Sequence, residues 1–204
     1  MFRGSFMAEI VVLVVAVAVI VWLVAYMRAQ KPVTTAQSLI QLHQYKEAAA
    51  IEPHDSAGHL HRAEALKLLG SFDEAIAEYR HSDDPAAQEG MALALTHLGR
   101  ELDDAHRLME TTIALHPQIQ EFQALGLAYI LLRRGDRHAA LRIYGDHAEL
   151  LETRFRDDYT DPDPLLAETL VMYAALADAA GESERAVTLR QKAARWAPGS
   201  VWSV

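Results

Sequence analysis

Histidines are the side chains in this sequence whose type and spacing come nearest to a metal or catalytic site. The chain has ten of them, and His54, His59 and His61 fall within one short stretch. No two of these three are four residues apart with a glutamate between them, which is the arrangement that a zinc hydrolase helix requires. The others are scattered along the chain. We therefore interpret the histidines as solvated or capping groups and expect no metal site.

A run of aspartates is the second candidate for chemistry. Asp157, Asp158, Asp161 and Asp163 could suggest calcium, but the segment lacks the glycine and the distal bidentate glutamate of an EF-hand loop. We interpret it as a solvated loop between helices. The chain also has no cysteine, no glycine-rich phosphate loop, no serine nucleophile elbow and no paired-carboxylate arrangement. We therefore expect no catalytic residues and no cofactor, and so a protein that is not an enzyme.

Charge is distributed unevenly along the chain. The formal net charge is −9, from 19 basic and 28 acidic residues, and only three of the basic residues and one acidic residue precede Pro32. An acidic domain is a poor match for nucleic acid, whose phosphates require a basic surface, and it is repelled by anionic lipid. We therefore expect no nucleic-acid partner, and attachment to a membrane must come from an apolar segment.

Residues 10–27 form an uncharged apolar run of 18 residues. As a helix this run would cover roughly 27 Å, close to the roughly 30 Å hydrocarbon core of a bilayer. Trp22 and Tyr26 fall near its end, where aromatic side chains prefer the headgroup level. A cleaved signal peptide is the alternative, but its apolar region is shorter, about 7–15 residues, and ends in a small-x-small cleavage site. The sequence therefore predicts an uncleaved transmembrane helix that contacts the lipid bilayer.

Basic residues beside this helix bear on its orientation. Arg28 and Lys31 follow it and Arg3 precedes it, so the positive-inside rule favours a cytoplasmic position for the rest of the chain over a periplasmic one. A start of translation at Met7 would remove Arg3 and strengthen that assignment. The chain has no asparagine and far more arginine than lysine, a bias typical of GC-rich bacterial genomes. We expect a single-pass protein of a bacterial inner membrane.

Small residues recur at fixed spacings along the rest of the chain. Four times an alanine is followed seven residues later by a glycine, and the glycine five or six residues later by another alanine. Small residues let two helices cross closely, and a glycine can end the first helix in a left-handed cap. The pattern predicts repeated pairs of antiparallel helices, the last of them stopped by Pro198. The repeated positions are Ala63, Gly70, Ala75, Ala92, Gly99, Ala105, Ala128, Gly135, Ala140, Ala174, Gly181 and Ala186.

These positions resemble the 34-residue tetratricopeptide repeat. Residues 170–198 match that pattern best, and residues 72–76 (Phe-Asp-Glu-Ala-Ile) resemble the way the family opens its second helix. The glycine spacings, 29, 36 and 46 residues, depart from a steady period. The resemblance implies an all-α protein with one transmembrane helix followed by a right-handed superhelix of antiparallel helix pairs. A stack of helical hairpins unrelated to the family is the alternative.

The predicted organisation follows from the apolar run and the repeats. It comprises a short N-terminal segment at 1–9, the transmembrane helix at 10–27, a linker at 28–33 and the repeat domain at 34–204. Within that domain the units are predicted at about 34–53, 57–85, 86–117, 121–150 and 165–198. The first unit is degenerate, because His43 stands where the turn glycine would be and Pro53 cuts its second helix short.

The resemblance also implies a binding surface, because first helices line the concave side of such a superhelix. Family members that grip a C-terminal carboxylate use asparagines and lysines there, and this chain has no asparagine. Its aromatic and thioether side chains suit an amphipathic helix or an extended apolar segment better. Ordinary packing between helices is the alternative role for each of these residues. The residues expected in the groove are His61, Glu64, Lys67, His97, Phe122, Tyr129, Arg133 and Met172, and Leu93, Glu168 and Asp178 share their register.

A membrane-anchored scaffold is the function that these features favour. The resemblance implies an adaptor that binds one or more protein partners through the groove and assembles or regulates a complex at the membrane. The alternative is a tethered chaperone that holds unfolded clients for a secretion or cytochrome-maturation machine. A homo-oligomer is compatible with either function.

The C-terminal tail, residues 198–204, is unusually apolar for the end of a repeat array. Trp202 could fold back over the last helix near Trp196 and seal the core. Alternatively, the terminal Trp-Ser-Val and its carboxylate could be a ligand that adds to a sheet edge, as in PDZ-type binding. A disordered tail is the third alternative.

Overall fold

The computed structural model describes residues 35–115, 120–155 and 163–203. The chain divides into two units, Met1–Thr34 and Thr35–Val204, and every described residue belongs to the second. The predicted N-terminal segment, transmembrane helix and linker thus lie outside the described residues, as do three of the four aspartates considered for calcium. None of the helices that the structure describes is long and apolar enough to cross a bilayer.

The described residues form helices and turns, without a strand among them, so the all-α class is confirmed for this part of the chain. Two short 3-10 helices, η2 (Pro164–Leu166) and η3 (Val201–Ser203), accompany the α-helices. The α-helices are α2 (Ala36–Gln41), α3 (Tyr45–Ala50), α4 (Ser56–Leu68), α5 (Phe72–Tyr79), α6 (Pro85–Leu98), α7 (Leu102–Leu115), α8 (Gln120–Arg134), α9 (Arg137–Arg154), α10 (Ala167–Ala180) and α11 (Ser183–Trp196).

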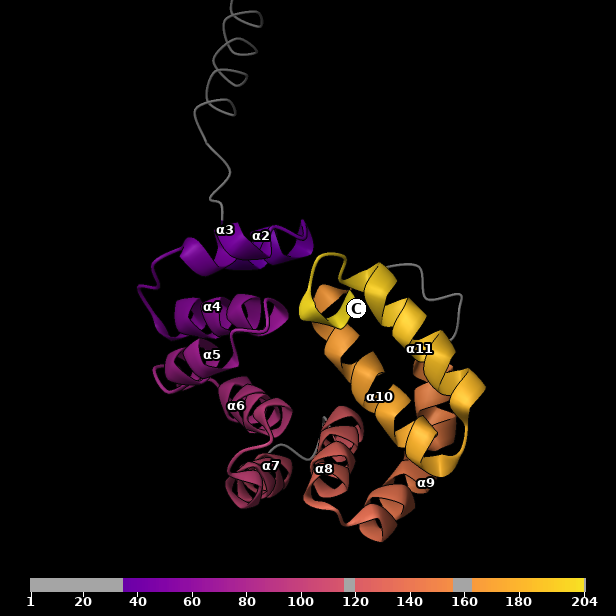
Figure 1. The fold of residues 1–204 in the computed structure, drawn as a ribbon. Coiled ribbons are helices and arrows are strands. Elements are labelled where there is room, and N and C mark those ends of the chain that lie inside the picture. Colours follow the sequence, from indigo (N-terminus) through magenta and orange to yellow (C-terminus); the bar gives the residue numbers. More distant parts are fainter. Residues whose placement is uncertain (1–34, 116–119, 156–162, 204) are drawn as a thin grey trace, which may run out of the picture. The chain divides into compact units, whose positions relative to one another are not determined.

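Consecutive helices pair into hairpins along this unit. α4 packs against α5, α6 against α7, α8 against α9 and α10 against α11, and Figure 1 shows the pairs following one another in a curve. All the alanines of the repeated pattern are 0 % exposed. Their burial means that the helices approach closely wherever the pattern supplies a side chain of a single methyl group.

Left-handed turns separate the two helices of a pair. The four glycines of the pattern have positive φ angles, from 67° to 92°, and Gly99 and Gly181 are the C-caps of α6 and α10. That conformation is costly for any residue with a Cβ. His43 nevertheless adopts it, with φ 58°, in the turn between α2 and α3. Glu101, with φ 48°, accommodates the extra residue between Gly99 and the next alanine of the pattern.

Some helix bounds differ from the predicted repeat units. Pro85 begins α6 instead of ending the unit before it, because the first helical position needs no N–H. The side chain of Asp84 caps this helix by accepting a hydrogen bond from Ala86 N at 2.8 Å. α9 extends to Arg154, beyond the predicted end at 150. Asp163 accepts from Leu165 N at 3.0 Å and so starts η2 before α10 begins.

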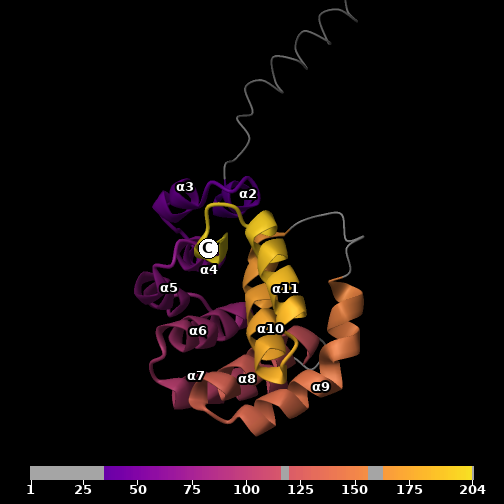
Figure 2. The same ribbon diagram turned by 45° about the vertical axis from the view of Figure 1, so that its right-hand side comes forward.

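The hairpins curve until the last pair meets the earlier ones. α10 contacts α8, and its Glu168 forms an ion pair with Lys67 of α4 and a hydrogen bond with His97 of α6. Figures 1 and 2 both place the C-terminal η3 beside α4. The inner side of the curve, which the sequence predicts to be a groove, is therefore partly filled by α10 and η3.

The tail folds back into the unit, and η3 contacts α11, as the first of its three interpretations expects. Trp202 is only 8 % exposed. Its ring centroid lies 4.7 Å from that of His97 and 6.0 Å from that of Phe72. The indole thus reaches the α5–α6 region, far along the chain from the helix that precedes the tail.

Candidate binding cavity

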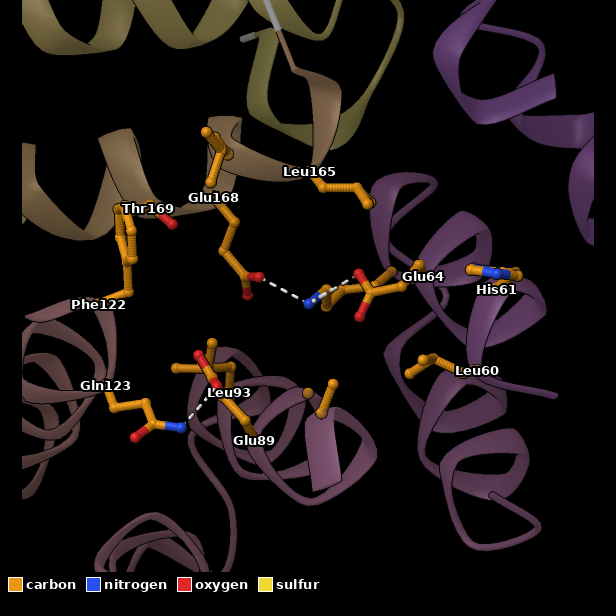
Figure 3. Close-up of a pocket in the computed structure, with 14 residues that line it drawn as sticks. Leu60, His61, Glu64, Glu89, Leu93, Phe122, Gln123, Leu165, Glu168 and Thr169 are labelled. Atoms are coloured by element: carbon orange, nitrogen blue, oxygen red, sulfur yellow. Dashed lines mark hydrogen bonds and ion pairs between the residues drawn. The ribbon is translucent and has the colours of Figure 1, made fainter. Parts of the chain in front are cut away.

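A cavity of about 320 Å³ lies on the inner side of the curve, and we call it the concave cavity. α4, α6, α8, η2 and α10 all contribute to its wall (Figure 3). Its apolar and small lining residues are Leu60, Ala86, Gly90, Leu93, Phe122, Leu165 and Leu166. Its polar lining residues are His61, Glu64, Lys67, Glu89, Gln123, Glu168 and Thr169.

Lys67 and Glu168 form the central ion pair of the cavity wall. Lys67 Nζ lies 2.7 Å from Glu168 Oε2 and 3.1 Å from Glu64 Oε2, and Figure 3 shows both carboxylates reaching toward this nitrogen. Lys67 is 5 % exposed and Glu168 4 %. Buried charges of this kind persist only when they are paired and hydrogen-bonded.

The pKa values of this pair follow from burial and from the opposite charge. Burial by itself lowers the pKa of Lys67, but the nearby carboxylates of Glu168 and Glu64 outweigh it and hold that pKa well above its usual value. Burial likewise raises the pKa of Glu168, but Lys67 and the hydrogen bond from His97 lower it to about 2. Both groups therefore remain charged at neutral pH.

His97 extends the polar contacts away from the cavity. Its Nε2 donates to Glu168 Oε1 at 2.9 Å, because a carboxylate can only accept. Its Nδ1 then accepts from Tyr129 Oη at 3.5 Å, and Arg133 Nη1 donates to Tyr129 Oη at 3.1 Å. The imidazole also stacks on Phe72, with ring centroids 5.3 Å apart. A chain of hydrogen bonds thus links α8, α6, α10 and α4.

Tyr79 of α5 also belongs to this hydrogen-bond network. Its Oη donates to Glu64 Oε1 at 2.7 Å, and its side chain is fully buried. The ring can pack there because the adjacent position in α6 is Gly90, where a Cβ would overlap the ring. Gly90 thus sets the spacing between α5 and α6 at the cavity wall.

Glu89 and Gln123 complete the polar side of the cavity. Gln123 Nε2 donates to Glu89 Oε2 at 3.4 Å, a long contact. Gln123 is 1 % exposed, and its Oε1 has no hydrogen-bond partner among the described residues. Burial raises the pKa of Glu89, against the opposing effects of Lys67 and of the hydrogen bond from Gln123. Unlike Glu168, Glu89 has no cation within ion-pair distance in the part of the chain that the structure describes.

The structure brings most of the predicted groove residues together, in three environments. Those that line the cavity are His61, Glu64, Lys67 and Phe122. Those in the adjoining network are His97, Tyr129 and Arg133. Met172 is 2 % exposed and packs in the hydrophobic core.

Three of the polar lining residues, Glu89, Gln123 and Thr169, were not predicted from the sequence. Glu89 is the only acidic residue in α6, among small and apolar neighbours, and an isolated charge in such a helix is a usable signal. Gln123 offered no comparable signal, because a glutamine early in a helix is ordinary. Its importance depends on Glu89, a residue of the preceding hairpin.

The histidines and aspartates considered first have separate surroundings. His59 Nδ1 lies 2.7 Å from Glu78 Oε2, and Asp163 caps η2. Within residues 35–115, 120–155 and 163–203, no group of three or more histidine, aspartate or glutamate side chains could hold a metal ion.

No protein-family model matches this chain, and no curated protein matches its sequence. The resemblance to tetratricopeptide repeats therefore stays a matter of the residue pattern. The function has to be argued from the cavity and its chemistry.

Proposed function

We propose that this chain is a membrane-anchored scaffold whose helical repeat unit binds a protein partner in the concave cavity. In this proposal the unit is a right-handed superhelix of tetratricopeptide type, residues 10–27 span a bacterial inner membrane, and the unit faces the cytoplasm. The partner belongs to a complex that the scaffold assembles or regulates.

The concave cavity is the observation on which the proposal mainly rests. Its wall combines leucines and Phe122 with several polar groups held in fixed positions. Ligand sites are commonly concave, largely apolar and equipped with a few placed polar groups. A volume of about 320 Å³ suits one or two side chains of a partner, not a whole helix.

Charge chemistry supports binding over catalysis. A general acid or base works best when its pKa lies near the operating pH. The pKa of Glu168 is lowered to about 2, and that of Lys67 is held well above its usual value. These two groups therefore act as fixed charges, and we propose no enzymatic reaction at this site.

The chaperone alternative fits the cavity less well. A holdase for unfolded clients needs a broad and adaptable apolar surface, commonly rich in methionine. Here the cavity is small, and the Lys67–Glu168 ion pair and the His97–Glu168 hydrogen bond, both between separate hairpins, hold its wall in place. A defined partner is favoured over a wide range of clients.

A substitution at the mouth of the cavity tests this function. Ala86 is exposed yet lines the cavity, so Ala86→Trp fills the entrance without disturbing the core. Ala114 of α7 is also exposed and does not line the cavity, which makes Ala114→Trp the matched control. The tagged full-length chain is purified from detergent-solubilised membranes, and the proteins recovered with each variant are quantified.

We expect Ala86→Trp to lose one or a few specific partners, about tenfold or more, while Ala114→Trp recovers them as the wild type does. Equal recovery by all three proteins would contradict binding in the cavity. A general loss across many unrelated proteins would favour the chaperone alternative instead.

A further inference from the structure

The charges around the concave cavity do not balance. Three carboxylates line it, those of Glu64, Glu89 and Glu168, against the one ammonium group of Lys67. Lys67 pairs with Glu64 and Glu168. Glu89 is left with the amide of Gln123 alone among the described side chains. Glu89 is partly buried, and a carboxylate that is withdrawn from water without a cation is costly, so the cavity is suited to a positive charge from outside.

Gln123 is a second and independent sign of a missing ligand. It is 1 % exposed, and it lines the cavity while its Oε1 has no partner. Buried amide oxygens are normally hydrogen-bonded. A half-turn of the amide exchanges Oε1 and Nε2, so that the oxygen can face the same space as the Glu89 carboxylate. The two side chains together then present acceptors and no donor to a ligand between them.

Apolar side chains beside these acceptors define the rest of the ligand. Leu93 and Phe122 line the same cavity as Glu89 and Gln123, and Leu60 and Leu165 lie across from them (Figure 3). A ligand that satisfies both parts has a positive head and an apolar stem. Lysine side chains bury their methylenes against apolar surfaces in this way.

We propose that the cavity binds a lysine side chain of the protein partner, with its ammonium group between Glu89 and Gln123 and its methylenes against Leu93 and Phe122. This inference rests on the proposed function, because it names the group of the partner that the cavity recognises.

An ammonium group suits these acceptors better than a guanidinium group. Arginine prefers a carboxylate that offers both oxygens in one plane with its fork. After the half-turn of the Gln123 amide, the acceptors are a carboxylate and an amide oxygen from different helices. A compact ammonium group with three rotatable donors can reach both. The cavity already holds the Lys67 ammonium between two carboxylates from separate helices.

Titration of the full-length chain with small probes tests the inference. The main probe is N-acetyl-lysine methylamide, and ligand-observed NMR in detergent gives its Kd. Three related probes change one property each: the norleucine analogue removes the charge, the ε-acetylated lysine neutralises it, and the arginine analogue replaces the head group. Cadaverine represents a free diamine as the source of the ammonium group.

We expect the lysine probe to bind and the three related probes to bind at least about tenfold more weakly. Cadaverine should not exceed the lysine probe, because it lacks the peptide groups of a partner chain. Comparable binding of the norleucine, acetylated or arginine probe would overturn the inference. Tighter binding of cadaverine would overturn the assignment to a lysine of a protein.

The Glu89→Gln variant shows whether this carboxylate is the recognising group. We expect it to weaken the lysine probe at least tenfold without lowering the melting temperature, because the substitution removes a partly buried charge that lacks a cation. Glu74→Gln on the exposed start of α5 is the control and should leave the Kd unchanged. Unchanged binding by Glu89→Gln would overturn the inference.

The probe titration and the partner recovery with Ala86→Trp test the two proposals independently. If no probe binds while Ala86→Trp still loses its partner, the lysine inference is wrong and the proposed function stands. If Ala86→Trp keeps every partner, the proposed function is wrong whatever the probes show.

Discussion

Glu89 and Glu168 are two carboxylates of one cavity whose pKa values are shifted in opposite directions. Glu168 meets Lys67 at 2.7 Å and His97 at 2.9 Å, and its pKa is lowered to about 2 despite its burial. Glu89 meets only the amide of Gln123 among the described residues, and burial raises its pKa. One carboxylate is thus a fixed charge of the framework, and the other is available to a ligand.

The raised pKa of Glu89 predicts a dependence of stability on pH. The folded state holds this proton more tightly than the unfolded chain, whose pKa is near the usual 4.5. The contribution of Glu89 to stability is therefore fully present below about pH 4.5 and is lost as the pH rises through the raised folded-state value. Lys67 opposes this shift, while Glu64 and Glu168 add to it.

Glu89→Gln should remove this loss of stability at higher pH. We expect its free energy of unfolding to match that of the wild type near pH 4, to exceed it increasingly as the pH rises through the raised pKa of Glu89, and to keep a constant excess above that pKa, because glutamine has no charge to bury. Urea unfolding of the full-length chain, followed by circular dichroism across this range, measures the difference. A difference that stays flat with pH, as we expect for the control Glu74→Gln, would contradict a partly buried Glu89 without a cation.

At the scale of elements, a single glycine sets how closely α5 and α6 pack. Gly90 lies inside α6, where glycine is normally unfavourable, and a Cβ there would overlap the fully buried Tyr79 ring. Tyr79 in turn holds Glu64 at the cavity. The cost of glycine in a helix interior is offset by this contact between helices.

Gly90→Ala and Gly145→Ala should therefore have opposite effects on the stability of the unit. We expect Gly90→Ala to destabilise the unit by about 1–3 kcal/mol through overpacking. Gly145 lies within α9 with nothing within 4 Å of a Cβ, so Gly145→Ala should stabilise it by about 0.5–1 kcal/mol. Thermal unfolding of both variants measures these changes. A stabilising Gly90→Ala would mean that α5 and α6 are further apart than described here.

The hairpins were predictable from the sequence because their determinants are local. An alanine at a helix crossing and a glycine in a turn act within one pair, so their spacing marks the pair directly. The bounds were less predictable: Pro85 fits both the end of one helix and the start of the next. His43 stands at a predicted turn position and has a positive φ angle, whereas nothing in the sequence indicated the positive φ angle of Glu101.

At the scale of the whole unit, the return of α10 to α4 and α6 could not be predicted from the repeat pattern. Small rotations between successive hairpins add up along the chain, and irregular spacings such as the 46 residues from Gly135 to Gly181 change that sum. The residues of the predicted groove could be identified from the sequence as a set. Their pairing across the unit, and the burial of Trp202 against His97, could not be predicted.

Closure of the inner side by the Lys67–Glu168 ion pair is the central claim, and a double-mutant cycle tests it most directly. Unfolding free energies are measured for the wild type, Lys67→Met, Glu168→Met and the double variant. We expect each single variant to lose about 3–5 kcal/mol, because it leaves a buried charge without its nearest opposite charge. The double variant should be more stable than the sum of the two losses implies, by about 1–3 kcal/mol.

The exposed pair Arg134–Asp103 supplies the matched control, since its shortest N–O distance is also 2.7 Å. Its cycle should give a coupling below about 1 kcal/mol, because solvent screens the pair. A coupling between Lys67 and Glu168 of at least about 1 kcal/mol, larger than that of the control, is the result that the structure predicts. Losses that add to within about 0.5 kcal/mol would contradict it, because α4 and α10 would then not meet across the cavity.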